Sequence, residues 1–386
     1  MNKETNIVFT GDFSFSGHFQ EKYLDDKFID KSILDFLNNS DACILNYESP
    51  ITPYKVTKKR RLHHRTNPEA LDYIKAKFKN PILSFANNHM KDYENIGLID
   101  TLELVEENQI KYIGAGRNKE EATRFEIVGK DIKVGVIAIQ YKKLHKSKNN
   151  FLGPFHESMI EDLAERITEM KKKVNWVVLV YHGGDEFLFA PMPYTRKLFK
   201  KFIKLGVDVV VGHHPHVVQG YEYFNNKPVF YSLGNFAFDT DYQRIQEGTE
   251  NGILLKLTFK KDKVLFDDFP ILINREKAKI EQGVKNPYFC DLGSKKYGAI
   301  WSYEAMRKKK ILKIAADLKS KELEDFNIDE TPKKPLFKRV IQYSERKLIK
   351  EKEATKKSLL LKLGRIKYKL FYNKKDFNSI YNFNSK

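Results

Sequence analysis

Three imidazoles stand close together in the segment 212–216, which reads Gly-His-His-Pro-His. The segment follows residues 207–211, a mostly apolar run with the length of a buried strand. Histidines gathered where a strand ends are typical of a metal site, and Pro215 stiffens the turn that carries them. The alternative is a turn that is merely polar or sensitive to pH. We expect metal binding by His214 and His216, because this is a leading use of clustered histidines.

Side chains of metal-ligating types also follow four other apolar runs of strand length. After the runs at residues 7–10, 42–45, 82–86 and 176–181 come, in that order, Asp12, Glu48, Asn88 with His89, and His182. Segments with helical periodicity separate the runs, and this alternation predicts an α/β fold with a largely parallel sheet. In such folds, ligands bind beyond the carboxyl ends of the strands. We therefore expect these side chains to converge on one site.

Carboxylate, amide and imidazole groups together form the ligand set of divalent Mn, Fe and Zn, with Mg and Ni as further candidates. A pair of such ions serves phosphoryl transfer, and a bound metal lowers the pKa of water toward about 7. His89 directly follows the expected ligand Asn88, so it is placed to protonate a leaving group. Asp92 is placed to fix the tautomer of His89. The sequence thus predicts one or two divalent metal ions and hydrolytic chemistry.

The same segments carry a resemblance to a known family. Its strongest pieces are Asn87-Asn88-His89, His213-His214-Pro215-His216 and Ser232-Leu233-Gly234-Asn235-Phe236. Together with Gly11-Asp12 they resemble the CapA (poly-γ-glutamate capsule synthesis) family, in that family's order, from residue 6 to residue 269. The family is part of the calcineurin-like metallophosphoesterase superfamily. The resemblance implies a four-layer α/β/β/α sandwich of the calcineurin-like metallophosphoesterase type, with a metal site at the strand ends.

The resemblance also implies roles for the matched residues. These roles are ligation of the first ion by Asp12 and His216, bridging by Glu48, ligation of the second ion by Asn88, His182 and His214, and acid catalysis by His89. One position departs from the superfamily pattern, because Ser14 stands where a histidine ligand is usual. The first site therefore loses a strong ligand. This departure puts two-metal catalysis in question more than metal binding itself.

Further candidates surround this set. Arg60 and Arg61 lie in a basic loop after the second strand and are candidates for a clamp on an anionic substrate, with a solvated loop as the alternative. Asn235 is a candidate for holding substrate or a metal ligand by hydrogen bonds, with a simple turn residue as the alternative. His63 and His64 are interpreted as loop residues rather than ligands.

The chain of 386 residues carries a net charge of +18, which favours anionic partners such as an acidic polymer. From residue 274 the composition becomes Lys-rich and helical, so we expect a CapA-type domain at 1–273 and a basic helical extension at 274–386. In the extension, Leu359, Leu363, Ile366 and Leu370 share one helical face, which favours contact with an anionic membrane surface. The alternatives are packing on its own domain or on a partner in a capsule-assembly complex.

The sequence shows no signal peptide and no stretch of transmembrane length, so we expect a cytoplasmic protein, peripheral on the inner face of the membrane if the extension binds there. Its two cysteines allow no disulfide framework, and nucleic acid is a disfavoured partner because no recognised binding module occurs. The leading hypothesis is a metal-dependent hydrolase of CapA type, acting on a phosphoester or related bond in biosynthesis or modification of a capsule, poly-γ-glutamate or another anionic surface polymer. The alternative is a non-catalytic, metal-containing subunit of a membrane-associated polymer assembly complex.

Overall fold

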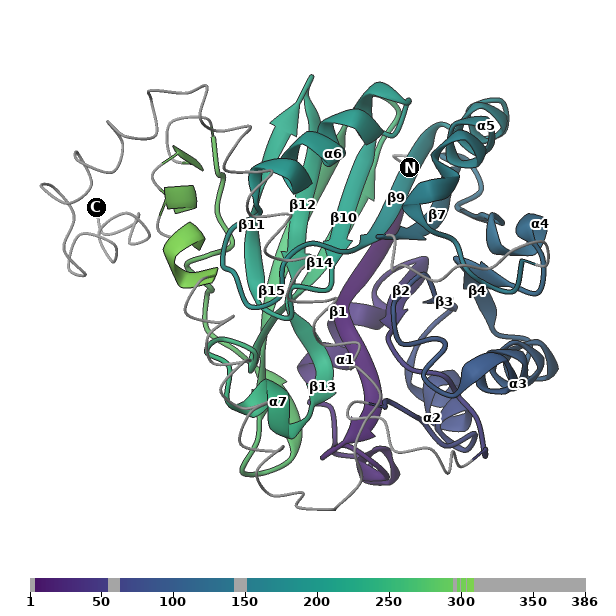
Figure 1. Ribbon diagram of the computed structural model, residues 1–386, viewed down its shortest axis with the longest axis vertical. Coiled ribbons are helices and arrows are strands. Elements are labelled where there is room, and N and C mark those ends of the chain that lie inside the picture. Colours follow the sequence, from purple (N-terminus) through teal and green to yellow (C-terminus); the bar gives the residue numbers. More distant parts are fainter. Residues whose placement is uncertain are drawn as a thin grey trace, which may run out of the picture. The chain divides into compact units, whose positions relative to one another are not determined.

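The computed structural model describes residues 4–54, 63–141, 151–293 and, except for 299 and 303, residues 297–308. The chain divides into two compact units, Met1–Lys308 and Lys309–Lys386, and all of the described residues belong to the first. Two large β-sheets form the centre of this unit, and helices lie on their outer sides (Figure 1). The predicted substrate clamp and the predicted membrane-contacting helix both lie outside the described residues.

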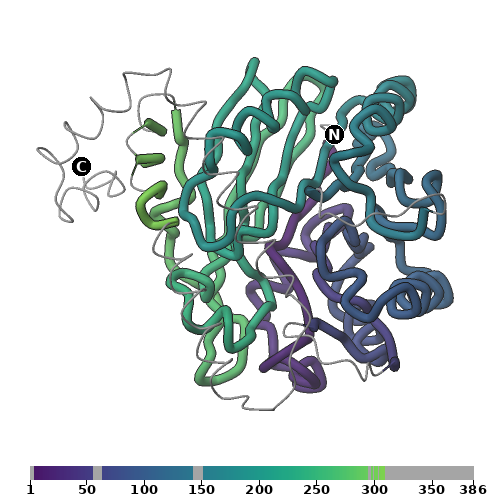
Figure 2. Tube along the Cα trace, in the orientation of Figure 1, coloured from purple at the N-terminus to yellow at the C-terminus, as the bar shows by residue number. Residues whose placement is uncertain are grey.

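The first sheet has the strand order β16-β15-β14-β1-β2-β3-β4, and β13 pairs with β1 as well. Strands β1 to β4 run parallel because a helix connects each strand to the next, whereas β14 to β16 are antiparallel. Strand β1, from the start of the chain, therefore lies beside strands from much later in the chain (Figure 2). The bounds are β1 Thr5–Gly17, β2 Ala42–Tyr47, β3 Pro81–Ser84, β4 Lys111–Ile113, β13 Asn235–Asp239, β14 Asn251–Phe259, β15 Val264–Asn274 and β16 Lys279–Gln282.

The second sheet has the order β11-β12-β10-β9-β7-β6. Its four central strands are parallel, and an antiparallel neighbour closes each edge. The β11–β12 hairpin turns on Asn225 and Asn226, whose positive φ values of 53° and 60° suit a two-residue turn. The bounds are β6 Glu126–Val128, β7 Val134–Gln140, β9 Trp176–His182, β10 Val209–His213, β11 Val218–Phe224 and β12 Lys227–Leu233, with a small separate ladder of β5 Ala115–Gly116 and β8 Gly153–Pro154.

Apolar side chains of the two sheets face each other and form an inner core. Along β7, Val134, Val136 and Ala138 alternate into this core, and Ile7 and Ile44 of the first sheet face them. The outer face of the first sheet packs on α1, α2 and α3, and the outer face of the second packs on α5 and α6. The predicted four-layer α/β/β/α sandwich is therefore confirmed. The helices are α1 Lys31–Asn38, α2 Ala70–Lys77, α3 Glu94–Glu107, α4 Lys119–Ala122, α5 Ile160–Lys171, α6 Pro193–Lys204 and α7 Asp241–Arg244.

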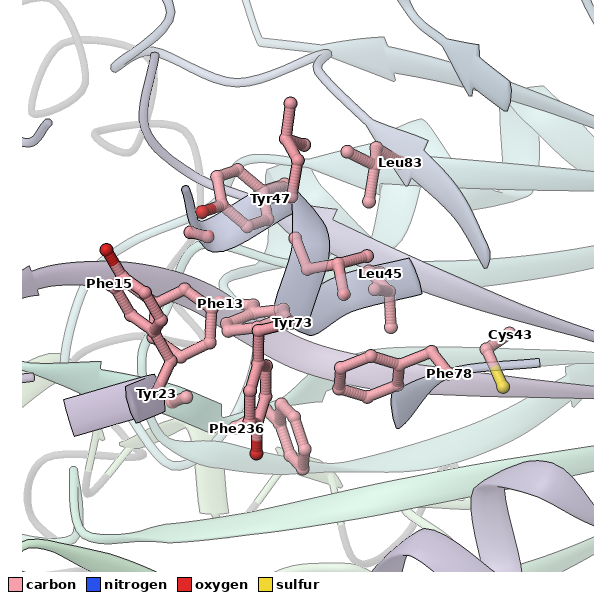
Figure 3. Packing of buried hydrophobic residues seen from close by; sticks show 14 of the residues in the cluster. Phe13, Phe15, Tyr23, Cys43, Leu45, Tyr47, Tyr73, Phe78, Leu83 and Phe236 are labelled. Atoms are coloured by element: carbon pink, nitrogen blue, oxygen red, sulfur yellow. The ribbon is translucent and has the colours of Figure 1, made fainter. Parts of the chain in front are cut away.

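An aromatic cluster packs outside the first sheet, next to the carboxyl end of β1 (Figure 3). The ring centroid of Phe13 lies 4.8 Å from that of Phe15, 5.1 Å from that of Tyr47 and 5.4 Å from that of Phe236, all edge-to-face. Such pairs contribute about 0.5–1.5 kcal/mol beyond the burial of their area. Because the rings come from β1, β2 and β13, the cluster fixes the relative positions of the three strand ends.

The first unit continues past the boundary predicted at residue 273. Strand β16 pairs with β15, and Ile280 is buried in the outer core. Phe289 packs in the inner core, where its ring stacks on Phe230 at 6.1 Å. Residues 274–293 therefore add to the sandwich itself, and 297–308 is helical at its described residues. No helix in the described part of the chain is long and apolar enough to cross a bilayer.

Candidate metal centre

The predicted ligands lie where the carboxyl ends of both sheets meet. In the first sheet, Asp12 of β1 is in register with Asn46 of β2 and with Asn235 of β13. In the second sheet, His182 is the last residue of β9 and is in register with His213 of β10. Parallel neighbours end at the same edge of a sheet, so the side chains that follow them gather in one place.

Glu48 follows β2 and lies at the centre of the cluster. Its Oε1 is 3.2 Å from Nε2 of His182, 3.8 Å from Nε2 of His89 and 3.9 Å from Nε2 of His216. The residue is fully buried, and neither carboxylate oxygen accepts a hydrogen bond from any described residue. Burying a carboxylate in this way costs on the order of several kcal/mol unless a positive charge compensates.

His182 and Asn88 form one side of the cluster. Nε2 of His182 is 2.8 Å from Oδ1 of Asn88. On the other side of the ring, Asn46 donates from Nδ2 to Oδ1 of Asp12 at 2.8 Å, and the same nitrogen is 3.2 Å from Nδ1 of His182. Asn46 thus engages Nδ1, so Nε2 faces Asn88 and Glu48. An amide nitrogen only donates, so Nδ1 accepts from Asn46 and the ring proton is on Nε2, where a bound cation would replace it.

His216 lies against two carboxylates. Its Nδ1 is 3.0 Å from Oδ2 of Asp12 and 2.9 Å from Oδ1 of Asn235. Burial alone would lower the pKa of His216, but the carboxylates of Glu48 and Asp12 outweigh burial and raise this pKa to about 10. Burial alone would raise the pKa of Asp12. The hydrogen bond and the charge of His216 outweigh burial and hold this pKa below its usual range. Both shifts show that the cluster attracts positive charge.

The turn after β10 brings His214 to the same place. Its main-chain N–H donates to both carboxylate oxygens of Asp12, at 3.3 and 3.2 Å. Its ring centroid is 4.9 Å from that of His182, and its Nε2 is 3.9 Å from Oε1 of Glu186. The φ values of His214 and His216 are 94° and 59°, in the left-handed region that side chains other than glycine rarely adopt. Strained backbone of this kind gathers at functional sites.

The residues present fit a divalent cation. Two sets each place one donor atom per residue within 4.8 Å of the others, namely Asp12 with Glu48 and His182, and Glu48 with His214 and His216. The buried Glu48 carboxylate lacks a hydrogen bond within the described chain, and oxygen with imidazole nitrogen is the donor set of borderline divalent metals. The donor set alone suits Mn, Fe and Zn equally.

His89 and Asp92 lie together at the edge of the cluster. Nδ1 of His89 is 2.7 Å from Oδ2 of Asp92, so Nε2 faces Glu48. The main-chain N–H of His64 donates to the same oxygen of Asp92 at 3.0 Å, and the ring centroids of His64 and His89 are 4.2 Å apart. Burial holds the pKa of His64 well below its usual value, and the charge of His89 adds to this effect. The interpretation of His64 as a loop residue is therefore incomplete, because its ring packs inside the site.

Hydroxyl groups occupy the position where a first-site histidine is usual. Ser14 is fully buried, and its Oγ is 2.9 Å from Oγ of Ser16 and 2.9 Å from Oγ of Ser49. Oγ of Ser16 is in turn 3.1 Å from Nδ1 of His64. These neutral hydroxyls bind metal more weakly than an imidazole. The local structure therefore agrees with the expected loss of a strong ligand at this side.

Asn235 is buried, and the protein engages both ends of its amide. Nδ2 donates to Oε1 of Gln243 at 3.1 Å and to the carbonyl of Thr249 at 2.9 Å, while Oδ1 faces His216. Of the two roles predicted for Asn235, holding a ligand is favoured over contact with substrate, because no part of the amide remains for a substrate.

Tyr141 is a site residue that sequence reasoning missed. It follows β7, and its main-chain N–H donates to the carbonyl of His182 at 2.9 Å. Its ring centroid is 4.9 Å from that of His214. Burial raises the pKa of the phenol, and the carboxylates of Glu186 and Glu48 raise it further. The strand before Tyr141 was expected, but a phenol at a strand end is not a metal-ligand signal. A search for hydrogen-bond donors at every strand end would have found it.

The loop 185–192 connects β9 to α6 beside the site, and the helix at 297–308 holds it. The main-chain N–H of Phe189 donates to Oε2 of Glu304 at 2.9 Å. The guanidinium of Arg307 lies over the Phe189 ring, 3.8 Å from its centroid. Burial raises the pKa of Glu304 to about 7, although Arg307 opposes this shift. Residues from beyond the predicted domain boundary thus position a loop of the site.

The chain is similar to several known proteins. Residues 6–240 match the family described as bacterial capsule synthesis protein PGA_cap. The chain is 31% identical over 264 residues to the PGA biosynthesis protein CapA of Bacillus subtilis (strain 168). This alignment covers 66% of the chain and 67% of that protein. It is 28% identical over 263 residues to the capsule biosynthesis protein CapA of Bacillus anthracis. This alignment covers 64% of the chain and 62% of that protein, so the chain spans less than two thirds of the length of this relative. A solved 5'-nucleotidase from Candida albicans SC5314 aligns with a TM-score of 0.38 and 12% identity, covering 71% of this chain and 52% of that chain.

Proposed function

Because the chain belongs to the PGA_cap family of bacterial capsule synthesis proteins, we propose that it is a metal-dependent hydrolase acting on a capsule, poly-γ-glutamate or a related anionic surface polymer. The observation that carries the proposal is the buried Glu48 carboxylate, which faces imidazoles and accepts no hydrogen bond from the described chain. The names of the two Bacillus relatives, which refer to capsule and PGA biosynthesis, support the polymer as the setting of the reaction.

In the proposed site, the cation or cations are held by Asp12, Glu48, Asn88, His182, His214 and His216. A bound divalent cation supplies Lewis acidity to a phosphoester or related bond and to a water molecule. Asn46 orients two of these ligands, because one amide nitrogen engages both Asp12 and His182. At His216 the direction is reversed, because Oδ1 of Asn235 accepts from Nδ1 of that imidazole. These amide contacts fix the directions of the metal-ligating side chains before a cation binds.

His89 is proposed as the proton donor to the leaving group. Asp92 holds Nδ1, which stabilises the protonated imidazole and directs Nε2 toward the cluster. His64 packs on the ring, and its main-chain N–H binds the same Asp92 oxygen, so the pair cannot easily rotate. A side chain that delivers a proton in this way contributes about 10²–10⁴-fold to the rate.

The proposal is tested by loading the full chain with Mn²⁺ and measuring metal content, melting temperature and hydrolysis of bis-p-nitrophenyl phosphate. At a Mn²⁺ concentration of 100 times Kd, binding stabilises the folded protein by about 2.7 kcal/mol, which raises the Tm of a unit of this size by about 4 °C. Glu48→Gln should lose this shift. The exposed and structurally remote Glu120→Gln is the control and should keep it.

His89→Ala separates metal binding from catalysis. The variant should retain the Mn²⁺-dependent rise in Tm and lose about 10²-fold or more in turnover, because a proton donor is removed without removing a ligand. If wild type and His89→Ala are equally inert on a broad panel of phosphoesters, the hydrolase proposal fails.

A second candidate is a non-catalytic metal-containing subunit of a polymer assembly complex, and the hydroxyl network of Ser14 favours it. A first site with a weak ligand set can hold one structural ion while lacking the second ion of a catalytic pair. In this candidate, the basic extension binds an anionic membrane. Liposome flotation of the full chain against a chain ending at residue 334 tests that binding, and equal flotation on anionic vesicles would exclude it.

A further inference from the structure

One exposed row on α6 is strongly basic. The helix contains no acidic residue, and Lys197, Lys201 and Lys204 are all exposed. Their spacing of four and three residues places them one above another on the helix surface. Tyr194 begins the same row and is 49% exposed. At a rise of 1.5 Å per residue, the row from Tyr194 to Lys204 is about 15 Å long. We name these four residues the α6 row.

A groove of about 490 Å³ runs along the α6 row. Its lining is almost wholly apolar, because the lysines contribute their stems, and it consists of Tyr194, Lys197, Leu198, Lys200, Lys201 and Lys204. Lysine stems can cover apolar surface while their ammonium groups stay in water. The groove is therefore suited to a ligand that has a hydrocarbon backbone and carries negative charges.

The described carboxylates do not neutralise this row. Within the ranges that the structure describes, Lys197, Lys201 and Lys204 form no salt bridge, and Lys201 has only a longer-range interaction with Glu157. Nearby carboxylates are occupied elsewhere: Glu222 by Arg196, Asp208 by Lys171 and Lys227, and Glu157 by Tyr181. The row thus has a net positive charge that an external anion would compensate.

The α6 row starts where the loop that follows His182 of the metal centre ends. Helix α6 follows directly on the loop 185–192, and it lies on the outer face of the second sheet near β10 and β12 (Figure 1). Nζ of Lys308 is 5.6 Å from the centroid of the Tyr194 ring and 2.6 Å from Oδ1 of Asp185. Asp185 is three residues after His182. A chain that leaves the site past Tyr194 therefore meets the lysines in succession.

We propose that the α6 row binds a linear polyanion, whose successive carboxylates or phosphates pair with successive lysines while one end reaches the metal centre. This inference rests on the proposed function, because the same polymer is the substrate there. Lysines are flexible point charges, so they accept anions along a chain without requiring a fixed geometry. A row one residue wide suits a linear chain better than a lipid surface, because a helix that lies on a membrane inserts a broad apolar face.

The test uses the full chain and a triple charge reversal, Lys197→Glu, Lys201→Glu and Lys204→Glu. The matched control reverses Lys22, Lys75 and Lys79, which are exposed on the opposite outer layer and change net charge equally. Binding of labelled linear poly-glutamate is measured by fluorescence anisotropy at two salt concentrations. The α6 variant should bind about tenfold more weakly or worse, and the control within about twofold of wild type.

Three further readouts decide the interpretation. Both variants should keep the Mn²⁺ content and the hydrolysis of bis-p-nitrophenyl phosphate, since the row is outside the metal centre. Equal loss of poly-glutamate binding in the two variants, or no loss in either, overturns the proposal. Loss of binding to phosphatidylserine vesicles with unchanged poly-glutamate binding also overturns it, in favour of a membrane surface. If no ester is hydrolysed, the proposed function fails, but polymer binding is still measured directly.

Discussion

A chain that ends at residue 273 should be unfolded, whereas a chain that ends at residue 308 should fold like the full protein. Residues 279–282 form β16, which pairs with the last residues of β15. Beyond 273, the buried apolar side chains include Ile280, Phe289, Leu292 and Ile300, whose exposed fractions are 0%, 7%, 0% and 2%. The shorter chain loses all of these.

The expected loss is comparable with the whole stability of a domain. Burying one such side chain contributes about 1.5–3 kcal/mol, so four contribute on the order of 6–12 kcal/mol. Typical domains are stable by only about 5–15 kcal/mol. The shorter chain also exposes the edge of β15 and the ring of Phe230, which Phe289 covers. It should therefore lack a cooperative transition.

Circular dichroism with thermal unfolding checks this expectation on chains 1–273, 1–308 and 1–386. The chain 1–308 is the matched control, and its Tm should lie within about 2 °C of the full chain, equivalent to about 1 kcal/mol. A chain 1–273 that melts cooperatively within a few degrees of 1–308 would refute the packing argument. It would then follow that residues 274–308 lie on the sandwich without stabilising it.

Three other changes have defined outcomes. Ser14→His should add an imidazole to the first site and raise the number of Mn²⁺ ions bound per chain by calorimetry, and an unchanged number would contradict the position assigned to Ser14. Tyr141→Phe keeps the ring against His214 but removes a hydrogen-bond donor, so hydrolysis should fall about tenfold at constant metal content. Full activity would mean that the phenol does not contact substrate. Burial raises the pKa of Glu304 from 4.5 to about 7, so the folded state binds its proton more tightly. The resulting stability is present below about pH 4.5 and is lost as pH rises through about 7, and Glu304→Gln should remove this fall of about 3 kcal/mol in urea titrations at pH 5 and pH 8. Parallel pH profiles for wild type and variant would exclude that role for Glu304.

The convergence of Asp12, Glu48 and His182 could be predicted because it follows from a simple geometric rule. Parallel strands that alternate with helices all end at one edge, so residues that follow the apolar runs meet without any knowledge of long-range contacts. The layers could also be predicted, because a sheet whose strands carry apolar residues on both faces must pack against other elements on both faces.

Other features depend on contacts that no local pattern encodes. His64 enters the site only because the returning end of its loop is fixed by main-chain hydrogen bonds between Thr66 and Pro50 and between Thr52 and Thr66. The role of residues 274–308 was hidden by composition, because a few buried side chains such as Ile280 and Phe289 are scattered among many charged residues. A four-residue strand is too short to show a period of its own.

The central position of β1 also has a consequence for how the protein is made. One of its sides pairs with β2, but the other side needs β13 and β14, which extend to residue 259. On the ribosome, β1 therefore waits for the synthesis of β13 and β14 with one of its edges unpaired. Such an open edge can capture strands of other nascent chains, so aggregation during synthesis is the hazard that this topology carries. Slowing elongation before codon 259 should lower the yield of folded protein, even though the finished sequence is unchanged.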